Sequence, residues 1–330
     1  MEYAGRIVVR MGAARKRAAL KSSGLRRRAI HLQEGATTIF CWVPKELEEA
    51  IASSSSKKEK KKTQKEQQEK PALLLLHGFG SNGTDAWAGH VGALAKHFAL
   101  FIPDLLFFGD SITRSPTRCS ELFQAECIHA ALLQLGVTTA FVAGHSYGGF
   151  VAYRLAHLFP SFVSKLVIIA SGLMMDSHSN DAALQKTGAS SIHDILVPSS
   201  LSTFKQTLQL VFNKPTTIPD FVLMALLKNP NRDHQLDLIN SIELGQDEVP
   251  TTLPKVSQKT LILWGDKDQI FDIKLAHTLE EYMDGNAQLK VFNGAGHVPQ
   301  VALGFNDEII SFLTKDMLDA SSTPNVLGDV

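Results

Sequence analysis

The chain has little cysteine, no long apolar run and no net charge. Its three cysteines, Cys41, Cys119 and Cys127, are too few for a disulfide framework, and no C-x-x-C pair predicts zinc or redox chemistry. No apolar segment among its 330 residues approaches the roughly 18 residues that cross a bilayer. The 33 basic and 33 acidic side chains cancel, which disfavours a nucleic-acid partner. These absences exclude a disulfide-stapled domain and a helical membrane protein, and they favour a cytoplasmic protein.

Positive charge is concentrated in two segments. Residues 1–28 hold nine basic residues and one acid, Glu2, and residues 57–70 hold seven lysines and three glutamates. We expect residues 1–27 to form a disordered basic arm. Contact with an anionic membrane and targeting to an organelle stay open as roles for it. Residues 53–70 consist mainly of Ser, Lys, Glu and Gln without apolar periodicity, which predicts a disordered insert.

Short apolar runs alternate with helix-length segments from Pro71 onward. Runs of this kind are typical of parallel strands that are buried on both faces. The predicted strands are Ala72–Leu76, Phe98–Ile102, Ala140–Ala143, Leu166–Ala170, Leu261–Trp264 and Gln288–Phe292, and a closing helix is predicted at Asn306–Met317. This alternation predicts an α/β fold with a mostly parallel central sheet and helices on both faces.

The strands stop between residues 171 and 255, where amphipathic helical pieces are separated by prolines. This segment is predicted to be a helical cap inserted between two late strands. The expected division is therefore a first core part over 28–170, the cap over 171–255, a second core part over 256–317 and a flexible tail over 318–330.

Two glycine motifs, each following a predicted strand, suggest different chemistry. Gly78-Phe79-Gly80-Ser81-Asn82-Gly83, with Asp104 21 residues later, satisfies the dinucleotide-binding fingerprint. Gly144-His145-Ser146-Tyr147-Gly148 has the form of a nucleophile elbow. A serine nucleophile needs a base and an orienting acid, and Asp268 and His297 follow later strands in the required order. A dinucleotide-binding oxidoreductase leaves those two motifs unexplained and is kept as a remote alternative.

With these motifs the chain resembles the α/β-hydrolase superfamily from about Arg28 to Met317. Within that superfamily it most resembles the plant-type monoacylglycerol-lipase-like and carboxylesterase-like members. The segments that carry the resemblance are His77-Gly78-Phe79-Gly80, Pro103-Asp104-Leu105, Gly109-Asp110-Ser111, Gly144-His145-Ser146-Tyr147-Gly148-Gly149, Leu263-Trp264-Gly265-Asp266-Lys267-Asp268 and Gly296-His297-Val298-Pro299. The resemblance implies Ser146 as nucleophile, His297 as base and Asp268 as acid, with Asp266 as a nearby competitor. It also implies an oxyanion hole from the backbone N–H groups of Phe79 and Tyr147, and no cofactor or metal.

The expected function is a serine hydrolase that cleaves neutral, monoacylglycerol-like or small lipophilic esters through an acyl-enzyme. A carbon–carbon-bond hydrolase and a slow, ligand-binding member resembling a hormone receptor stay open. The chain departs from the family at Leu106-Phe107-Phe108-Gly109, where relatives often have Pro-Gly-Phe-Gly. The apolar residues expected to line the substrate pocket are Phe107, Phe108, Phe204, Leu208, Phe221 and Met224. Nothing in the sequence predicts the oligomeric state.

Overall fold

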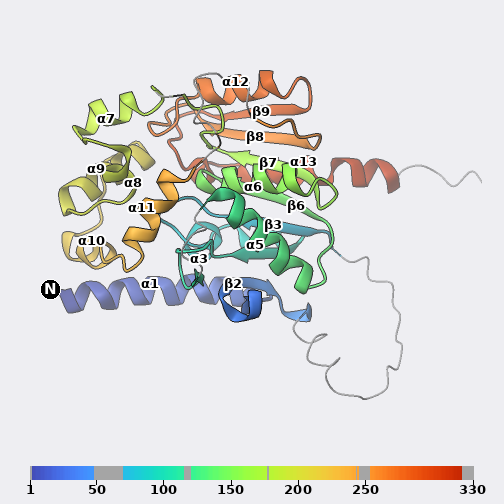
Figure 1. Cartoon of the computed structure of the whole chain (residues 1–330), viewed down its shortest axis with the longest axis horizontal. Coiled ribbons are helices and arrows are strands. Elements are labelled where there is room, and N and C mark those ends of the chain that lie inside the picture. The colour runs from blue at the N-terminus through green and yellow to red at the C-terminus, as the bar shows by residue number, and fades with distance from the viewer. Residues whose placement is uncertain are drawn as a thin grey trace, which may run out of the picture.

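The computed structural model describes residues 2–47, 70–114, 120–176, 178–242, 244 and 253–321. A nine-stranded sheet runs in the order β1-β2-β4-β3-β6-β7-β8-β9, and β5 pairs with β2 (Figure 1). Strands from β4 to β9 along this path are parallel, whereas β2 pairs antiparallel with β1, β4 and β5. The strands are β1 (Leu25–Leu32), β2 (Thr37–Pro44), β3 (Ala72–Leu76), β4 (Ala99–Pro103), β5 (Ile112–Thr113), β6 (Ala140–His145), β7 (Val163–Ile169), β8 (Lys259–Gly265) and β9 (Ala287–Phe292). The predicted mostly parallel sheet is confirmed.

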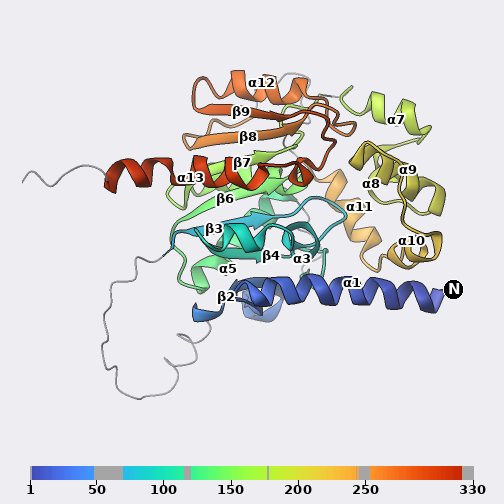
Figure 2. The same cartoon turned by 180° about the vertical axis from the view of Figure 1, so that it is seen from behind.

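Helices cover both faces of the sheet because alternate side chains of its strands point to opposite sides. Leu74 and Leu76 of β3 pack in one hydrophobic core with α5, α6 and α12, whereas Leu73 and Leu75 pack in a second core with α3, α4 and α13 (Figures 1 and 2). These helices are α3 (Gly83–Trp87), α4 (Val91–Leu94), α5 (Glu121–Gln134), α6 (Tyr147–Leu158), α12 (Lys274–Tyr282) and α13 (Phe305–Ser321). Short 3-10 turns form at η1 (Gln33–Gly35) and η3 (Pro299–Val301).

The segment between β7 and β8 is helical, as the sequence predicts. Its helices gather at one end of the molecule, beyond the sheet (Figure 1). They are α7 (Asp181–Thr187), α8 (Ile192–Leu196), α9 (Leu201–Phe212), α10 (Asp220–Leu226) and α11 (Arg232–Asn240). The predicted insert at 53–70 lies outside the described residues except for Lys70, and of the predicted tail the structure describes only the end of α13, to Ser321.

The N-terminal segment differs from the disordered arm expected from its composition. Residues Glu2–Ser22 form helix α1, and β1 starts at Leu25. Leu20 is fully buried, and Lys16 pairs with Asp85 of α3 at 2.8 Å. The packed face of α1 is built largely of small side chains, so hydropathy and charge along the sequence do not reveal it. Among the described helices, none is both long enough and apolar enough to cross a bilayer.

Helix α1 packs closely on α10 at Gly5. A β-carbon placed on Gly5 would lie 2.1 Å from the carbonyl oxygen of Phe221, whereas one on Gly12 would meet nothing within 4 Å. Alanine at position 5 must therefore push two helix backbones apart, and alanine at position 12 only raises helix propensity.

We expect Gly5→Ala to lower the free energy of unfolding by about 1–3 kcal/mol and Gly12→Ala to raise it by about 0.5–1 kcal/mol. Urea unfolding of the two variants and the parent measures both values. If both alanines stabilise the protein equally, α1 is not packed against α10.

Candidate active site

Ser146 occupies a strained turn between β6 and α6. Its φ of 52° and ψ of −118° are unusual for a residue with a side chain. The turn is closed by two backbone hydrogen bonds of 2.8 Å, from Ser146 N–H to the Ile169 carbonyl and from Gly149 N–H to the Ser146 carbonyl. It also needs two glycines. A β-carbon on Gly144 would lie 2.1 Å from the Gly148 carbonyl oxygen, and one on Gly148 would lie 2.6 Å from that of His77.

A hydrogen-bonded chain links the serine, the histidine and one aspartate. The Ser146 hydroxyl lies 2.9 Å from His297 Nε2, and His297 Nδ1 lies 2.8 Å from Asp268 Oδ2. The second oxygen of Asp268 accepts the backbone N–H groups of Ile270 at 2.8 Å and Phe271 at 3.0 Å. The Asp268 side chain is fully buried. This arrangement suits an Nδ1-protonated imidazole whose Nε2 can take the serine proton.

Asp266, the competing acid in the sequence, does not take part in this chain. Its Oδ1 accepts the Gly294 N–H at 2.5 Å, and its Oδ2 pairs with Lys267 at 3.3 Å. The structure thus brings Asp268 to His297 and uses Asp266 to join two loops.

The backbone of His297 is held on two sides. Its carbonyl accepts a hydrogen bond of 2.9 Å from Nε2 of the buried His145, and its N–H donates at 2.9 Å to the carbonyl of Val211 in α9. The ring of Phe271 stands edge-on to the His297 imidazole, with 5.4 Å between ring centroids. The sequence motifs gave no indication of Val211 or Phe271, because neither contact depends on a recognisable residue pattern.

The loop after β3, which carries Phe79, lies beside Ser146. A β-carbon on Gly78 would be 3.2 Å from Cβ of Ser146. His77 Nε2 accepts the Leu105 N–H at 2.9 Å, so its Nδ1 carries the proton and donates to the Gly78 carbonyl at 2.8 Å. In a trans peptide C=O and N–H point in opposite directions, so this bond also fixes the direction of the Phe79 N–H.

The second predicted oxyanion donor, Tyr147, is the first residue of α6. The amides of a helix's first turn have no partner within that helix, so the Tyr147 N–H is suited to bind an anion. Its ring is edge-to-face with that of Phe79, with centroids 5.8 Å apart, and Phe108 packs edge-on to Phe79 at 5.0 Å. Aromatic side chains therefore surround the two candidate donors.

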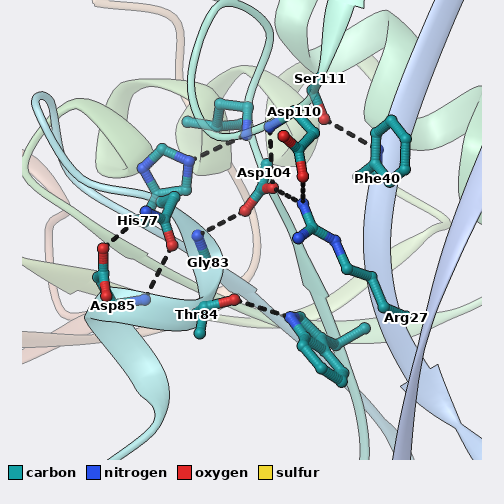
Figure 3. A network of polar contacts seen from close by, with 12 residues as sticks. Arg27, Phe40, His77, Gly83, Thr84, Asp85, Asp104, Asp110 and Ser111 are labelled. Atoms are coloured by element: carbon teal, nitrogen blue, oxygen red, sulfur yellow. Dashed lines mark hydrogen bonds and ion pairs between the residues drawn. The ribbon is translucent and has the colours of Figure 1, made fainter. Parts of the chain in front are cut away.

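A polar network around the buried Asp104 supports the loop from the side of β1 and β4 (Figure 3). Asp104 Oδ1 accepts the Gly83 N–H at 2.9 Å, and Oδ2 accepts Arg27 at 2.6 Å and the Asp110 N–H at 3.3 Å. Arg27 also pairs with Asp110 at 2.7 Å. Burial raises the pKa of Asp104, and the charge of Arg27 opposes that rise.

This network engages the carboxylate that a dinucleotide site would need for the ribose. Both carboxylate oxygens of Asp104 are engaged by protein groups, so they are not free for a ribose. Gly83 opens a helix of only five residues, which Asn82 caps by accepting the Asp85 N–H. The described part of the chain contains no cluster of three or more His, Cys, Asp or Glu side chains that could hold a metal ion.

The six residues predicted to line the substrate pocket lie in different environments. Phe108 is buried beside Phe79. Phe204 and Leu208 are half-buried on α9, and Phe221 is half-buried on α10. Met224 is 52% exposed, so of the six it fits a buried pocket least.

Phe107, the remaining member of the six, attaches the cap to the core. It has a φ of 69°, and its carbonyl accepts the side-chain amides of Asn231 at 3.1 Å and Gln235 at 2.9 Å. Its ring stacks on that of His234, with centroids 4.5 Å apart. The residue that departs from the family pattern therefore holds helix α11 in place.

Comparisons with known proteins indicate which proteins the chain is similar to. A sequence family described as the alpha/beta hydrolase fold matches residues 71–191. The chain is 28% identical to Lipase 3 of Moraxella sp. (strain TA144), over 69% of this chain and 72% of that lipase. It is 27% identical to the pimeloyl-[acyl-carrier protein] methyl ester esterase of Vibrio cholerae serotype O1, over 74% of this chain and 94% of that esterase.

Solved structures share the whole architecture at lower sequence identity. A membrane phospholipase A described as a bacterial virulence factor superposes with a TM-score of 0.71 at 20% identity, covering 97% of this chain and 94% of that one. The 2-hydroxy-6-oxo-6-phenylhexa-2,4-dienoate hydrolase from Rhodococcus sp. strain RHA1 gives a TM-score of 0.66 at 18% identity, covering 89% and 99%. At these identities the likeness establishes the fold.

Two histidines beside the site give the protein a predictable acid sensitivity. Burial lowers the pKa of His77 to about 4 and that of His145 to about 3, from 6.5. Below about pH 6.5 these two histidines therefore bind protons in the unfolded chain but not in the folded one. The free energy of unfolding decreases as the pH is lowered.

Each of these histidines should lower the free energy of unfolding by about 1.4 kcal/mol for every pH unit below about pH 6.5. Urea unfolding between about pH 7 and 5 should show that the unfolding free energy of His145→Gln depends less steeply on pH than the parent's, by about one bound proton, or about 1.4 kcal/mol per pH unit. Glutamine keeps an N–H near the position of Nε2, which can donate to the His297 carbonyl. Equal slopes would mean that His145 is accessible to protons in the folded protein.

Proposed function

The chain belongs to the α/β-hydrolase superfamily and is an ester-hydrolysing enzyme, and we propose that Ser146, His297 and Asp268 are its catalytic triad. The observation that carries the proposal is the continuous chain from Ser146 Oγ through both imidazole nitrogens of His297 to the buried Asp268 carboxylate. It starts at a residue with a strained backbone at a helix N-terminus, the geometry that an exposed nucleophile requires.

In the proposed reaction, His297 Nε2 takes the Ser146 proton as Oγ attacks the ester carbonyl. The backbone N–H groups of Phe79 and Tyr147 stabilise the oxyanion, and Asp268 stabilises the imidazolium. His297 then gives its proton to the departing alcohol, which leaves an ester on Ser146. A water molecule, deprotonated by the same imidazole, attacks that ester, and His297 returns the proton to Ser146 Oγ as the carboxylic acid leaves.

We further propose that the substrates are neutral, lipophilic esters such as monoacylglycerols. The side chains beside the candidate oxyanion donors are aromatic, and most basic side chains of the cap already have partners. Lys205 pairs with Asp220, Lys186 with Gln269, and Arg232 with the Val197 carbonyl, while Lys228 also has a partner. A free cation that could clamp a carboxylate or phosphate is therefore not favoured.

Asp268→Asn should lower kcat/KM by roughly 10³–10⁴-fold, because the amide oxygen keeps the two backbone N–H bonds and its NH₂ group then faces His297 Nδ1. That imidazole is left in the tautomer that cannot accept the serine proton. Asp266→Asn is the matched control, because its amide oxygen can still accept the Gly294 N–H, and we expect less than about a fivefold loss.

Hydrolysis of p-nitrophenyl esters by both variants, with Ser146→Ala as the inactive baseline, measures these effects. Labelling with a fluorophosphonate should disappear in Ser146→Ala. If labelling persists in that variant, or if Asp266→Asn is the more damaging substitution, the proposed triad is wrong.

Acyl chain length provides the test of substrate class. Each methylene buried contributes about 0.8 kcal/mol, so kcat/KM should rise about two- to fourfold per carbon from acetyl to medium chains and then level off. A series of p-nitrophenyl esters and a monoacylglycerol series measure the rise, and a dicarboxylic half-ester is the charged comparison. Flat rates along the series, or preference for the half-ester, would contradict a lipophilic pocket.

A further inference from the structure

Helix α1 has an apolar face on the side that points away from the protein. Gly5 and Leu20 are buried on its inner side. At 100° per residue, Ile7, Met11, Ala14 and Ala18 form one line on the opposite side, and all four are exposed. Met11 is 67% exposed, and Tyr3, one turn before Ile7, is 78% exposed. A helix that only covers a protein surface would carry polar residues along that line.

Exposed apolar side chains are concentrated at this end of the molecule. Among the described residues, twelve large hydrophobic side chains are exposed, and four of them belong to α1. Four more lie in and between the adjacent cap helices α9 and α10, namely Phe212, Ile218, Met224 and Leu226. Both views show the N-terminal half of α1 and helix α10 together at the same end of the molecule (Figures 1 and 2).

Arginines border the apolar line of α1. By the same helical geometry, Arg10 and Arg17 lie on one side of it and Arg15 lies on the other. All three are exposed, and within the described part of the chain none has a hydrogen-bonding or ion-pair partner. Glu2 is the single acid in the sequence of α1. An apolar stripe with flanking arginines is the pattern of a helix that lies in a membrane interface, where the arginines reach phosphate groups.

We propose that the outward face of α1 docks the protein onto an anionic lipid surface, with the helix lying parallel to the membrane plane. The stripe of Tyr3, Ile7 and Met11 enters the acyl boundary, and the arginines bind lipid phosphates. A second copy of the chain is a poorer occupant, because a twofold contact would place the arginines of one stripe near those of the other. The proposal does not depend on the catalytic triad and can be tested in Ser146→Ala.

A tryptophan reporter locates the contact. The native tryptophans Trp42, Trp87 and Trp264 are buried, so their emission changes little when lipid is added. Met11→Trp places an indole in the stripe, and Leu303→Trp places one at an exposed position outside α1. With vesicles containing phosphatidylserine, we expect a blue shift for Met11→Trp and none for Leu303→Trp. With pure phosphatidylcholine the shift of Met11→Trp should be much smaller.

Vesicle co-sedimentation separates the apolar and ionic contributions. Met11→Glu should weaken binding to phosphatidylserine-containing vesicles by about tenfold or more, whereas Leu303→Glu, which adds the same charge elsewhere, should have little effect. Arg10→Gln with Arg17→Gln should weaken binding by about fivefold per residue, and high salt should mimic that loss. The double variant with lysine at both positions should bind nearly as well as the parent.

Three outcomes would overturn the proposal. One is equal binding of the parent and Met11→Glu to anionic vesicles. Another is the absence of binding to any vesicle; if analytical ultracentrifugation then shows a dimer that Met11→Glu dissociates, the stripe is a contact between copies. The third is a blue shift of Leu303→Trp as large as that of Met11→Trp. The fold of each variant is checked by its urea unfolding midpoint.

Discussion

The site depends on keeping Ser146 in a backbone conformation that costs about 1–3 kcal/mol in isolation. The surrounding sheet supplies that free energy. β6 lies between β3 and β7, and the Ser146 N–H bonds to the last residue of β7, while Gly148 fits against the carbonyl after β3. Three neighbouring parallel strands must therefore end at the same level for the turn to close. The buried leucines of β3 and the apolar residues of β6 and β7 fix that level.

The same strands position two histidines that orient the backbone of the proposed catalytic site. His77, directly after β3, turns the Gly78 peptide, and His145, the last residue of β6, holds the His297 carbonyl. His77 must be neutral to make its bonds, since its Nε2 accepts the Leu105 N–H, and the burial of His145 disfavours its charged form. Burial lowers the pKa of both imidazoles and so keeps them neutral at about pH 7. Burial therefore suits His77 and His145 to structural roles, although they are the same residue type as His297.

The sequence allows the sheet and the candidate triad to be predicted because both leave a local pattern. Six apolar runs mark six parallel strands, and Ser146, Asp268 and His297 each follow a strand within a short motif. The contacts of α1 leave no such pattern, because Gly5 packs against backbone and the visible residues of that segment are its arginines. Phe107, which is predicted to line the pocket, also uses its carbonyl to hold α11, a contact for which any residue type would supply the same atom. Backbone contacts between distant segments are therefore the features of the structure that sequence patterns do not predict.

One such backbone contact divides the cap into two differently anchored parts. The carbonyl of Val211, in the last turn of α9, lacks a partner within the helix and accepts the His297 N–H. Moving α9 away would leave both groups unpaired, at a cost of about 1–3 kcal/mol for each buried group. Helix α10, in contrast, packs on α1 and, among the described residues, makes no hydrogen bond to the loops that carry the triad. The cap thus contacts His297 through α9, and through α10 it contacts α1, the helix with the exposed apolar stripe. A displacement of α1 on a surface would reach α10 before it disturbs the alignment of His297.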